Sequence, residues 1–242
     1  MKLKESLFTV FLLVITLVVA VVVYKFFLPD FIRKGGPLVV LLIAITLMLI
    51  TYIVERILTL KKARGSAPIP DFYRSFIMAV NEGKFEDAAT ICDKQRGSAA
   101  AVLKAGVEAY LRGVKMKLTG DKRLAETQRS IEEARLLEIP FLERNLFALS
   151  TIASIATMIG LLGTVIGMIR CFAAMAHQGS PDAIQLAVGI SEALINTAGG
   201  LFAAILGIVA YNIFVNLVDS FNYSVDEGAF MFMEILKEKE AQ

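Results

Sequence analysis

One apolar stretch, residues 152–169, constrains the fold of this chain more than any other feature. A helix needs roughly 17–25 apolar residues to cross a bilayer, and this stretch has that length. Hydroxyl or thiol side chains nevertheless recur in and around it every seven residues, at Ser150, Thr157, Thr164 and Cys171. Seven residues are close to two helical turns, so these side chains drift only about 20° per step. Such a stripe indicates close packing on neighbouring helices or a polar path.

The composition excludes most soluble classes of protein. The chain has 242 residues, of which 56% are hydrophobic, and its mean hydropathy of +0.65 is too high for a soluble domain. A net charge of +2 gives no sign of nucleic-acid binding. Cys92 and Cys171 lie too far apart to suggest a disulfide framework or a metal site. The single histidine, His177, is interpreted as a solvated loop residue, and alone it cannot support a histidine-based catalytic site. We expect no enzymatic activity and no bound cofactor.

Apolar runs and charged segments alternate along the chain. The pattern predicts an all-α, multi-span helical membrane protein with about four transmembrane helices, the long third and fourth helices extending into a cytoplasmic helical domain. The expected organisation is an extra N-terminal transmembrane helix in 1–28, a loop and second transmembrane helix in 29–64, a cytoplasmic helical domain in 65–144, the third and fourth transmembrane helices with a short periplasmic loop in 145–218, and a cytoplasmic tail in 219–242. For residues 7–28 a signal peptide is the alternative to a retained anchor helix, but no small-residue cleavage site follows.

The middle of the chain reads as soluble and helical. Apolar residues at spacings of three and four predict short amphipathic helices ending near Asn81 and covering 84–94 and 98–111. Alternating charges predict a longer helix from 121 to 138, continuing past Pro140 with a kink into the third span. This segment contains no nucleotide-binding loop, metal-ligand spacing or nucleophile motif.

The distribution of basic residues predicts the orientation in the membrane. Lys61, Lys62 and Arg64 follow the second span and place that end in the cytoplasm by the positive-inside rule. Both termini are then expected to be cytoplasmic. Arg33 and Lys34, in the loop before the second span, argue in the opposite direction but are fewer.

The fourth span carries a small-residue face with polar members. Its residues recur at spacings of three or four: Gly189, Ala193, Asn196, Gly200, Ala203 and Gly207. Glu192 lies beside this face, about ten residues inside the span, where a lipid-facing carboxylate costs about 2.5–3.5 kcal/mol or more. It must therefore face protein, water or a partner, and two interpretations stay open: a hydrogen bond that holds helices together, or a place in an ion pathway. Arg170 is expected to reach toward the outer interface.

Two motifs resemble a known family. Gly160-Leu161-Leu162-Gly163-Thr164-Val165-x-Gly167-Met168-Ile169 resembles the third-span signature of the MotA/TolQ/ExbB proton-channel family. Gly189-Ile190-Ser191-Glu192-Ala193-Leu194-Ile195-Asn196-Thr197-Ala198-x-Gly200, followed by Tyr211-Asn212-x-Phe214, resembles the next span of the ExbB and TolQ branch.

The resemblance implies roles for particular residues. Thr164 and Thr197 match the pore threonines, and Glu192 matches the family glutamate. A pore wall or helix-packing role falls to Gly160, Gly163, Gly167, Asn196 and Gly200. For both threonines, a hydrogen bond back to their own helix is the alternative interpretation. Three departures are visible: Leu206 stands where a proline is usual, a proline near Thr157 is missing, and the first span is additional to the three-span ExbB plan.

The resemblance also implies a location in the inner membrane of a bacterium, a function and partners. Such subunits form a homo-oligomer, a pentamer, around a dimer of a single-span ExbD/TolR-like protein that carries an intramembrane aspartate, and a TonB- or TolA-like protein and membrane lipid are further partners. Protons or sodium ions cross at the interface and drive mechanical work in the cell envelope. Two alternatives remain: a MotA-like flagellar or gliding stator subunit, and a non-conducting membrane scaffold.

Overall fold

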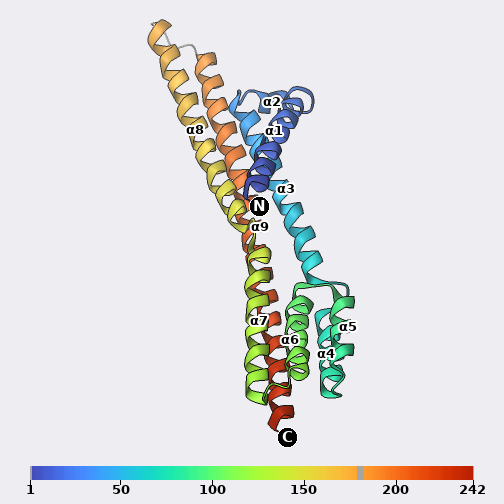
Figure 1. Ribbon diagram of the computed structural model, residues 1–242. Helices are drawn as coiled ribbons and strands as arrows, with labels where there is room; N and C mark the ends of the chain where they lie inside the picture. Colours follow the sequence, from blue (N-terminus) through green and yellow to red (C-terminus); the bar gives the residue numbers. More distant parts are fainter. Residues whose placement is uncertain (1, 179–182, 242) are drawn as a thin grey trace. The chain divides into compact units, whose positions relative to one another are not determined.

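The computed structural model describes the backbone of residues 2–178 and 183–241 and the side chains of residues 13–173, 184 and 186–241. All regular secondary structure in these ranges is α-helical, which confirms the predicted fold class (Figure 1). The helices are α1 (Lys2–Phe26), α2 (Asp30–Arg33), α3 (Leu38–Arg64), α4 (Ile69–Asn81), α5 (Phe85–Gln95), α6 (Ser98–Lys115), α7 (Gly120–Glu143), α8 (Leu146–Gln178) and α9 (Ala183–Ala241).

These helices form two compact units. The first, called here the spanning unit, comprises Met1–Glu55 and Asn145–Ile213. The second, called here the helical unit, comprises Arg56–Arg144 and Phe214–Gln242. Both α3 and α9 contribute residues to each unit, so neither unit is a continuous segment of the chain.

Three helical stretches in the described part of the chain are long and apolar enough to cross a membrane. They lie within Leu38–Asn81, Gly120–Ala173 and Leu186–Ala241. The fourth expected span, 7–28, corresponds to α1, of which the part with described side chains, Leu13–Phe26, is a shorter apolar helix. The expected loop residues 179–182 and the His177 side chain lie outside the described residues.

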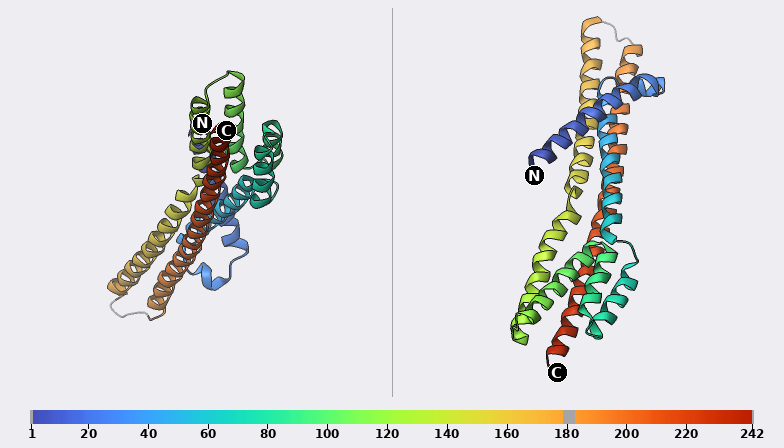
Figure 2. Two further views of the ribbon diagram at one scale, coloured as in Figure 1. Left: turned by 90° about the horizontal axis from the view of Figure 1, so that it is seen from below. Right: turned by 45° about the vertical axis from the view of Figure 1, so that its right-hand side comes forward.

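In the spanning unit, α8 runs antiparallel to the first part of α9, and α3 packs along α9 in the parallel direction (Figures 1 and 2). Gly207 of α9 lies close to both Ala153 of α8 and Leu49 of α3. Nearer the N-terminal end of α9, Gly199 lies close to Leu42 of α3. The outward faces of α8 and α9 carry large exposed apolar side chains, as a lipid-facing surface requires.

Arg33 closes the C-terminal end of α1. Its Nε donates to the Tyr24 carbonyl oxygen at 3.1 Å and its guanidinium donates to the Lys25 carbonyl oxygen at 2.6 Å. The last carbonyls of a helix lack partners within the helix and carry partial negative charge, so a cation there is favourable. A local capping role thus accounts for a basic residue in a loop where the orientation rule expects few.

In the helical unit, α4, α6 and α7 each contact the last third of α9, and α5 packs against α4 and α6. The core residues that are completely buried include Phe76, Val80, Val102, Phe232 and Leu236. The Phe76 and Phe232 rings meet edge to face with centroids 5.4 Å apart. Of residues 219–242, predicted as a tail, 219–241 are therefore a continuation of α9 and supply part of this core.

Two helix boundaries differ from the prediction. The helix α7 does continue through Pro140, but it ends at Glu143, and α8 begins separately at Leu146. Between them Asn145 has a φ of 64°, in the left-handed region that asparagine tolerates. The Asn145 Nδ2 donates to the Glu55 carboxylate at 3.1 Å, a tertiary contact that stabilises the break. The chain therefore interrupts the helix at Arg144 and Asn145 instead of continuing it unbroken into the third span.

Candidate ion-path site

A seam of glycines joins α8 to α9. A Cβ atom on Gly160 would lie 3.1 Å from the Asn196 carbonyl oxygen, and one on Gly167 would lie 2.9 Å from the Ala193 Cβ. On the other helix, a Cβ atom on Gly200 would lie 2.6 Å from the Ala156 carbonyl oxygen. Only glycine lets the two backbones approach this closely, which is the usual way that membrane helices associate.

The remaining predicted wall residues also lie in this seam. A Cβ atom on Gly163 would clash with the Asn196 side chain, so these two residues are in direct contact. The stripe of hydroxyl and thiol residues on α8 ends at Cys171. The Cys171 Sγ donates to the Leu186 carbonyl oxygen at 3.5 Å and also lies against Gly189. The seam thus runs along α8 from Gly160 to Cys171.

Thr164 and Thr197 lie at similar heights along the seam. Because Gly160 faces Thr197 and Gly163 faces Asn196, the antiparallel register places the two threonines within about one helical turn, ~5 Å, along the helix axes. Both residues are half-buried. The Thr197 Oγ1 donates across the seam to the Gly160 carbonyl oxygen at 3.2 Å, whereas the Thr164 Oγ1 donates to the Leu161 carbonyl oxygen of its own helix at 2.6 Å.

Glu192 forms an ion pair with Arg170. The Arg170 Nη1 lies 2.5 Å from the Glu192 Oε1, and the carboxylate side chain is 12% exposed whereas the guanidinium side chain is 54% exposed. Arg170, expected to reach alone toward the interface, therefore has a specific partner. The pair joins α8 to α9 at some distance from the threonines, since Glu192 stands more than one turn from Thr197 on α9.

The turn before α3 is held against the same part of α9. The Asn196 Nδ2 donates to the Gly35 carbonyl oxygen at 2.9 Å. Gly36 has a φ of +74°, and a Cβ atom there would lie 2.5 Å from the Glu192 Oε1. In the sequence, two consecutive glycines before Pro37 indicate a turn, but no local pattern indicates that Glu192 and Asn196 contact it.

Asn196 leaves one polar atom without a partner. The residue is completely buried, and its Oδ1 accepts no hydrogen bond within the described protein atoms. A buried carbonyl oxygen of this kind favours a donor beside it, such as a water molecule or a protonated side chain. The seam therefore combines two half-buried hydroxyls with one unsatisfied acceptor, which together can support a short polar path.

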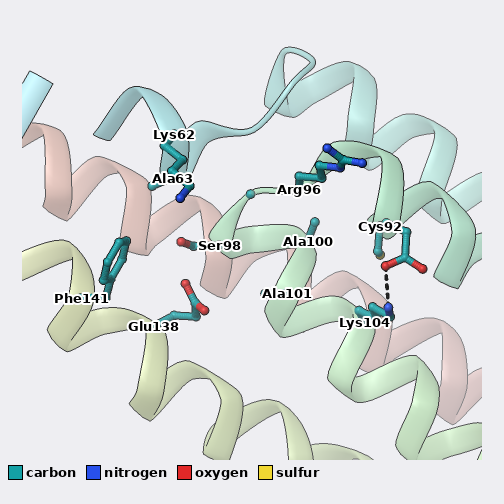
Figure 3. Close-up of a pocket in the computed structure, with 12 residues that line it drawn as sticks. Lys62, Ala63, Cys92, Arg96, Ser98, Ala100, Ala101, Lys104, Glu138 and Phe141 are labelled. Atoms are coloured by element: carbon teal, nitrogen blue, oxygen red, sulfur yellow. Dashed lines mark hydrogen bonds and ion pairs between the residues drawn. The ribbon is translucent and has the colours of Figure 1, made fainter. Parts of the chain in front are cut away.

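A separate hollow in the helical unit contains a buried thiol (Figure 3). The hollow has a volume of about 320 Å³ and is lined by residues that include Cys92, Ser98, Lys104 and Glu138. Lys104 is paired with Asp93 at 2.5 Å. Burial, and secondarily the negative charge of Asp93, raise the pKa of the Cys92 thiol from 9.0 to about 12. This thiol is therefore protonated and unreactive, and we assign it a packing role.

Comparison with known proteins identifies relatives of this chain. A segment of 86 residues is 44% identical to the Tol-Pal system protein TolQ of Haemophilus influenzae, covering 36% of this chain and 38% of that protein. Another segment of 81 residues is 40% identical to the biopolymer transport protein ExbB of Salmonella typhimurium, covering 34% of this chain and 33% of that protein.

A longer match spans most of the chain. Over 188 residues the chain is 30% identical to a putative biopolymer transport protein ExbB homolog of Methanothermobacter thermautotrophicus, covering 77% of this chain and 62% of that protein. The matched segments thus span less than two thirds of each of these relatives. Residues 95–227, which contain the whole seam, match the MotA/TolQ/ExbB proton channel family. The chain is a membrane protein, and it belongs to the MotA/TolQ/ExbB proton channel family.

Proposed function

We propose that this chain is the channel-forming subunit of an inner-membrane motor of the ExbB and TolQ type, which couples a proton or sodium motive force to mechanical work in the cell envelope. The observation that carries the proposal is the glycine seam, which presents Thr164 and Thr197 at one height beside the unsatisfied Asn196 Oδ1. Family membership supplies the class of function.

The proposed partner supplies a carboxyl group beside Thr164 and Thr197. The sequences of α8 and of α9 up to Ile213 contain Glu192 as their one acid, and Glu192 is engaged with Arg170. A proton relay needs a carboxyl group that can exchange protons at the threonines. We propose that a single-span ExbD/TolR-like protein supplies an aspartate there, as a dimer inside a pentamer of this chain, with a TonB- or TolA-like protein as the recipient of the motion.

The energy available is adequate for such work. Moving one elementary charge through 100 mV yields about 2.3 kcal/mol, so several ions per step can drive a large rearrangement. In this proposal the basic end of α3 faces the cytoplasm, where both termini lie. The chain then acts as a transporter subunit rather than an enzyme, with the ion as cargo and no bound cofactor.

The test is a double substitution of the two threonines. The variant Thr164→Val/Thr197→Val keeps the side-chain shape and removes both hydroxyls. In vesicles containing this chain and its single-span partner, we expect ion flux driven by an imposed membrane potential to fall about tenfold or more, since a polar contact in the membrane contributes about 1–2 kcal/mol. Measuring flux with a proton or a sodium gradient in turn identifies the ion.

The matched control is Thr46→Val/Thr51→Val on α3. Both of these hydroxyls donate to carbonyls of their own helix, at 2.8 Å each, away from the seam. The control should conduct normally, and size-exclusion chromatography should show the same oligomer for all three proteins. Unchanged flux in the seam variant would show that the ion path lies elsewhere.

A non-conducting scaffold is the second candidate function, and one observation favours it. Both threonine hydroxyls already donate to protein carbonyls, as packing residues do. The scaffold predicts that the double valine variant weakens assembly without any loss of flux, because there is no flux to lose. A MotA-like flagellar or gliding stator differs from the ExbB and TolQ type in the partner's envelope domain, so the sequence of the partner separates these two.

A further inference from the structure

A groove in the helical unit lies between the last turns of α3 and the middle of α9. It has a volume of about 320 Å³, within the range of small-ligand sites. Ile57 and Leu60 line it from α3, and Leu217 and Phe221 line it from α9. Ile57 is 51% exposed and Leu217 is 44% exposed, so the apolar floor of the groove is open to its surroundings.

The charged residues of this groove are both cations. Lys61 and Arg64 line it from the last turn of α3, and none of the described residues that line it is acidic. Both side chains are exposed, and within the described part of the chain neither forms an ion pair. The closest acid in the sequence of α9, Asp219, is two residues from Leu217 and therefore points about 200° away around the helix.

The groove lies where two apolar runs end. The uncharged run of α3 ends at Val54, before Glu55 and Arg56, and the basic cluster at Lys61 and Lys62 follows shortly after. The run of α9 gives way to Asp219. Helices that cross a bilayer leave the hydrocarbon at such positions, where lipid phosphates and the first acyl methylenes meet. Basic pockets between transmembrane helices on the cytoplasmic side are typical sites for acidic lipid headgroups.

We propose that this groove binds one anionic phospholipid, with its phosphate between Lys61 and Arg64 and an acyl chain along Ile57, Leu217 and Phe221. A zwitterionic lipid offers the same acyl chain but a compensated headgroup charge. If a second copy of this chain docked through the same groove, Lys61 and Arg64 of one copy would face Lys61 and Arg64 of the other, which is electrostatically unfavourable. The proposal needs α3 and α9 to cross the membrane, and it is independent of the ion-path assignment.

A single tryptophan can report on the groove, because the natural sequence contains none. Phe221→Trp places an indole in the groove by a conservative exchange. The full chain is reconstituted in vesicles of equal parts phosphatidylglycerol and phosphatidylcholine, in which only one of the two lipids carries brominated acyl chains. Bromine quenches an adjacent indole, so the ratio of the two quenching constants measures which lipid occupies the site.

We expect brominated phosphatidylglycerol to quench the indole of the Phe221→Trp variant at least about fivefold more strongly than brominated phosphatidylcholine, since each of the two basic residues near an acidic lipid contributes about this factor. Adding Lys61→Gln/Arg64→Gln to this variant should bring the ratio to about one. The matched control Lys115→Gln/Lys122→Gln removes two exposed cations elsewhere in the helical unit and should leave the ratio unchanged.

A second reporter controls for general lipid contact. Phe202 is also on α9 and 60% exposed, but the hollow that it lines contains no charged residue. Phe202→Trp should therefore be quenched equally by the two lipids. If Phe221→Trp fails to fold, Leu60→Trp reports from the opposite wall of the same groove.

Three results would overturn the proposal. Equal quenching of the Phe221→Trp indole by the two lipids would show that Lys61 and Arg64 do not favour the anionic lipid over the zwitterionic one. An absence of quenching by either lipid would show that protein, such as a second copy of the chain, fills the groove. A preference that survives Lys61→Gln/Arg64→Gln would show that the anionic lipid binds elsewhere.

Discussion

Asn196 is the residue at which three parts of the spanning unit meet. It contacts Gly163 of α8, donates to the Gly35 carbonyl oxygen before α3, and belongs to α9 itself. Its amide group is buried completely, and its Oδ1 accepts no bond among the described protein atoms. Such a group stabilises one arrangement of the three segments and leaves an acceptor available to a further donor.

Replacing Asn196 by alanine tests its structural part. Asn196→Ala removes the bond to Gly35 and leaves that carbonyl oxygen without a partner, so we expect a loss of about 1–2 kcal/mol in the free energy of unfolding. Thermal unfolding of the purified protein in detergent, followed by circular dichroism, measures this. Asn212→Ala, on the same helix but exposed, should unfold like the wild type. Equal stability of the two variants would mean that the Asn196 bond contributes nothing.

Cys92 gives a prediction about reactivity and pH. Because burial and Asp93 raise its pKa from 9.0 to about 12, the thiolate population at pH 8 is about a thousandfold lower than for an ordinary thiol. In a Cys171→Ala variant, alkylation by iodoacetamide should be slower by at least this factor than in the same protein unfolded in denaturant. Alkylation at similar rates in the two states would show that Cys92 is accessible and ionised.

The raised pKa of Cys92 also makes the free energy of unfolding depend on pH. The folded helical unit favours the neutral thiol, so this contribution is complete below pH 9 and is lost as the pH rises from 9 to about 12.

At the scale of single helices, the glycine seam makes a prediction with an internal control. A Cβ atom on Gly200 would lie 2.6 Å from the Ala156 carbonyl oxygen, whereas one on Gly199 would meet only the Leu42 Cδ1 at 3.4 Å, an ordinary contact. Gly200→Ala should therefore force α8 and α9 apart and cost about 1–3 kcal/mol. Gly199→Ala should be tolerated. Unfolding by a denaturing detergent, measured on both variants, compares them directly.

Helix boundaries were predictable where local chemistry sets them. The helix α4 ends at Asn81, and Gly83 follows just after it with a φ of +75°, a conformation that glycine adopts freely. The break at Asn145 was not predictable in the same way, because it depends on a bond to Glu55, 90 residues away in the chain. Local patterns also could not show that residues after Asp219 pack among α4, α6 and α7, since a charged amphipathic helix reads equally well as a solvated tail.

The site was predictable in its composition but less so in its contacts. The motifs located Thr164, Thr197 and the glycines, and the structure places these residues in one seam. The Arg170–Glu192 pair had a signal that could have been used. The two residues stand at equal distances, eleven positions, from residue 181 in the expected turn, and an antiparallel hairpin brings such positions to the same height.

At the scale of the whole molecule, α9 is shared by both units. Its first part lines the seam, and its last part places Phe232, Met233 and Leu236 in the core of the helical unit. Glu240 then joins α9 to two helices, accepting from the Tyr110 hydroxyl at 2.7 Å and pairing with Arg123 at 3.0 Å. The helical unit is therefore closed by the last residues of the chain rather than by its middle segment alone.

Truncation of one side chain tests this closure. Phe232→Ala should destabilise the helical unit by about 3–5 kcal/mol, because it removes a completely buried ring that packs against Phe76. The control Phe230→Ala removes a ring that is 69% exposed and should change stability little. Limited proteolysis of the full chain in detergent should cut α4 to α7 faster in the first variant only. Equal cleavage rates would show that the unit is stable without the α9 core.

Because α9 belongs to both units, neither unit can complete its fold until the ribosome has synthesised α9. At about 5–20 residues per second, α3 and α8 enter the membrane several seconds before α9 is complete. Until then the seam face of α8 has no partner, and the apolar faces of α4 and α6 stay uncovered. A chain that stalls or stops within α9 would display both surfaces at once, which makes it a natural target for membrane-bound proteases.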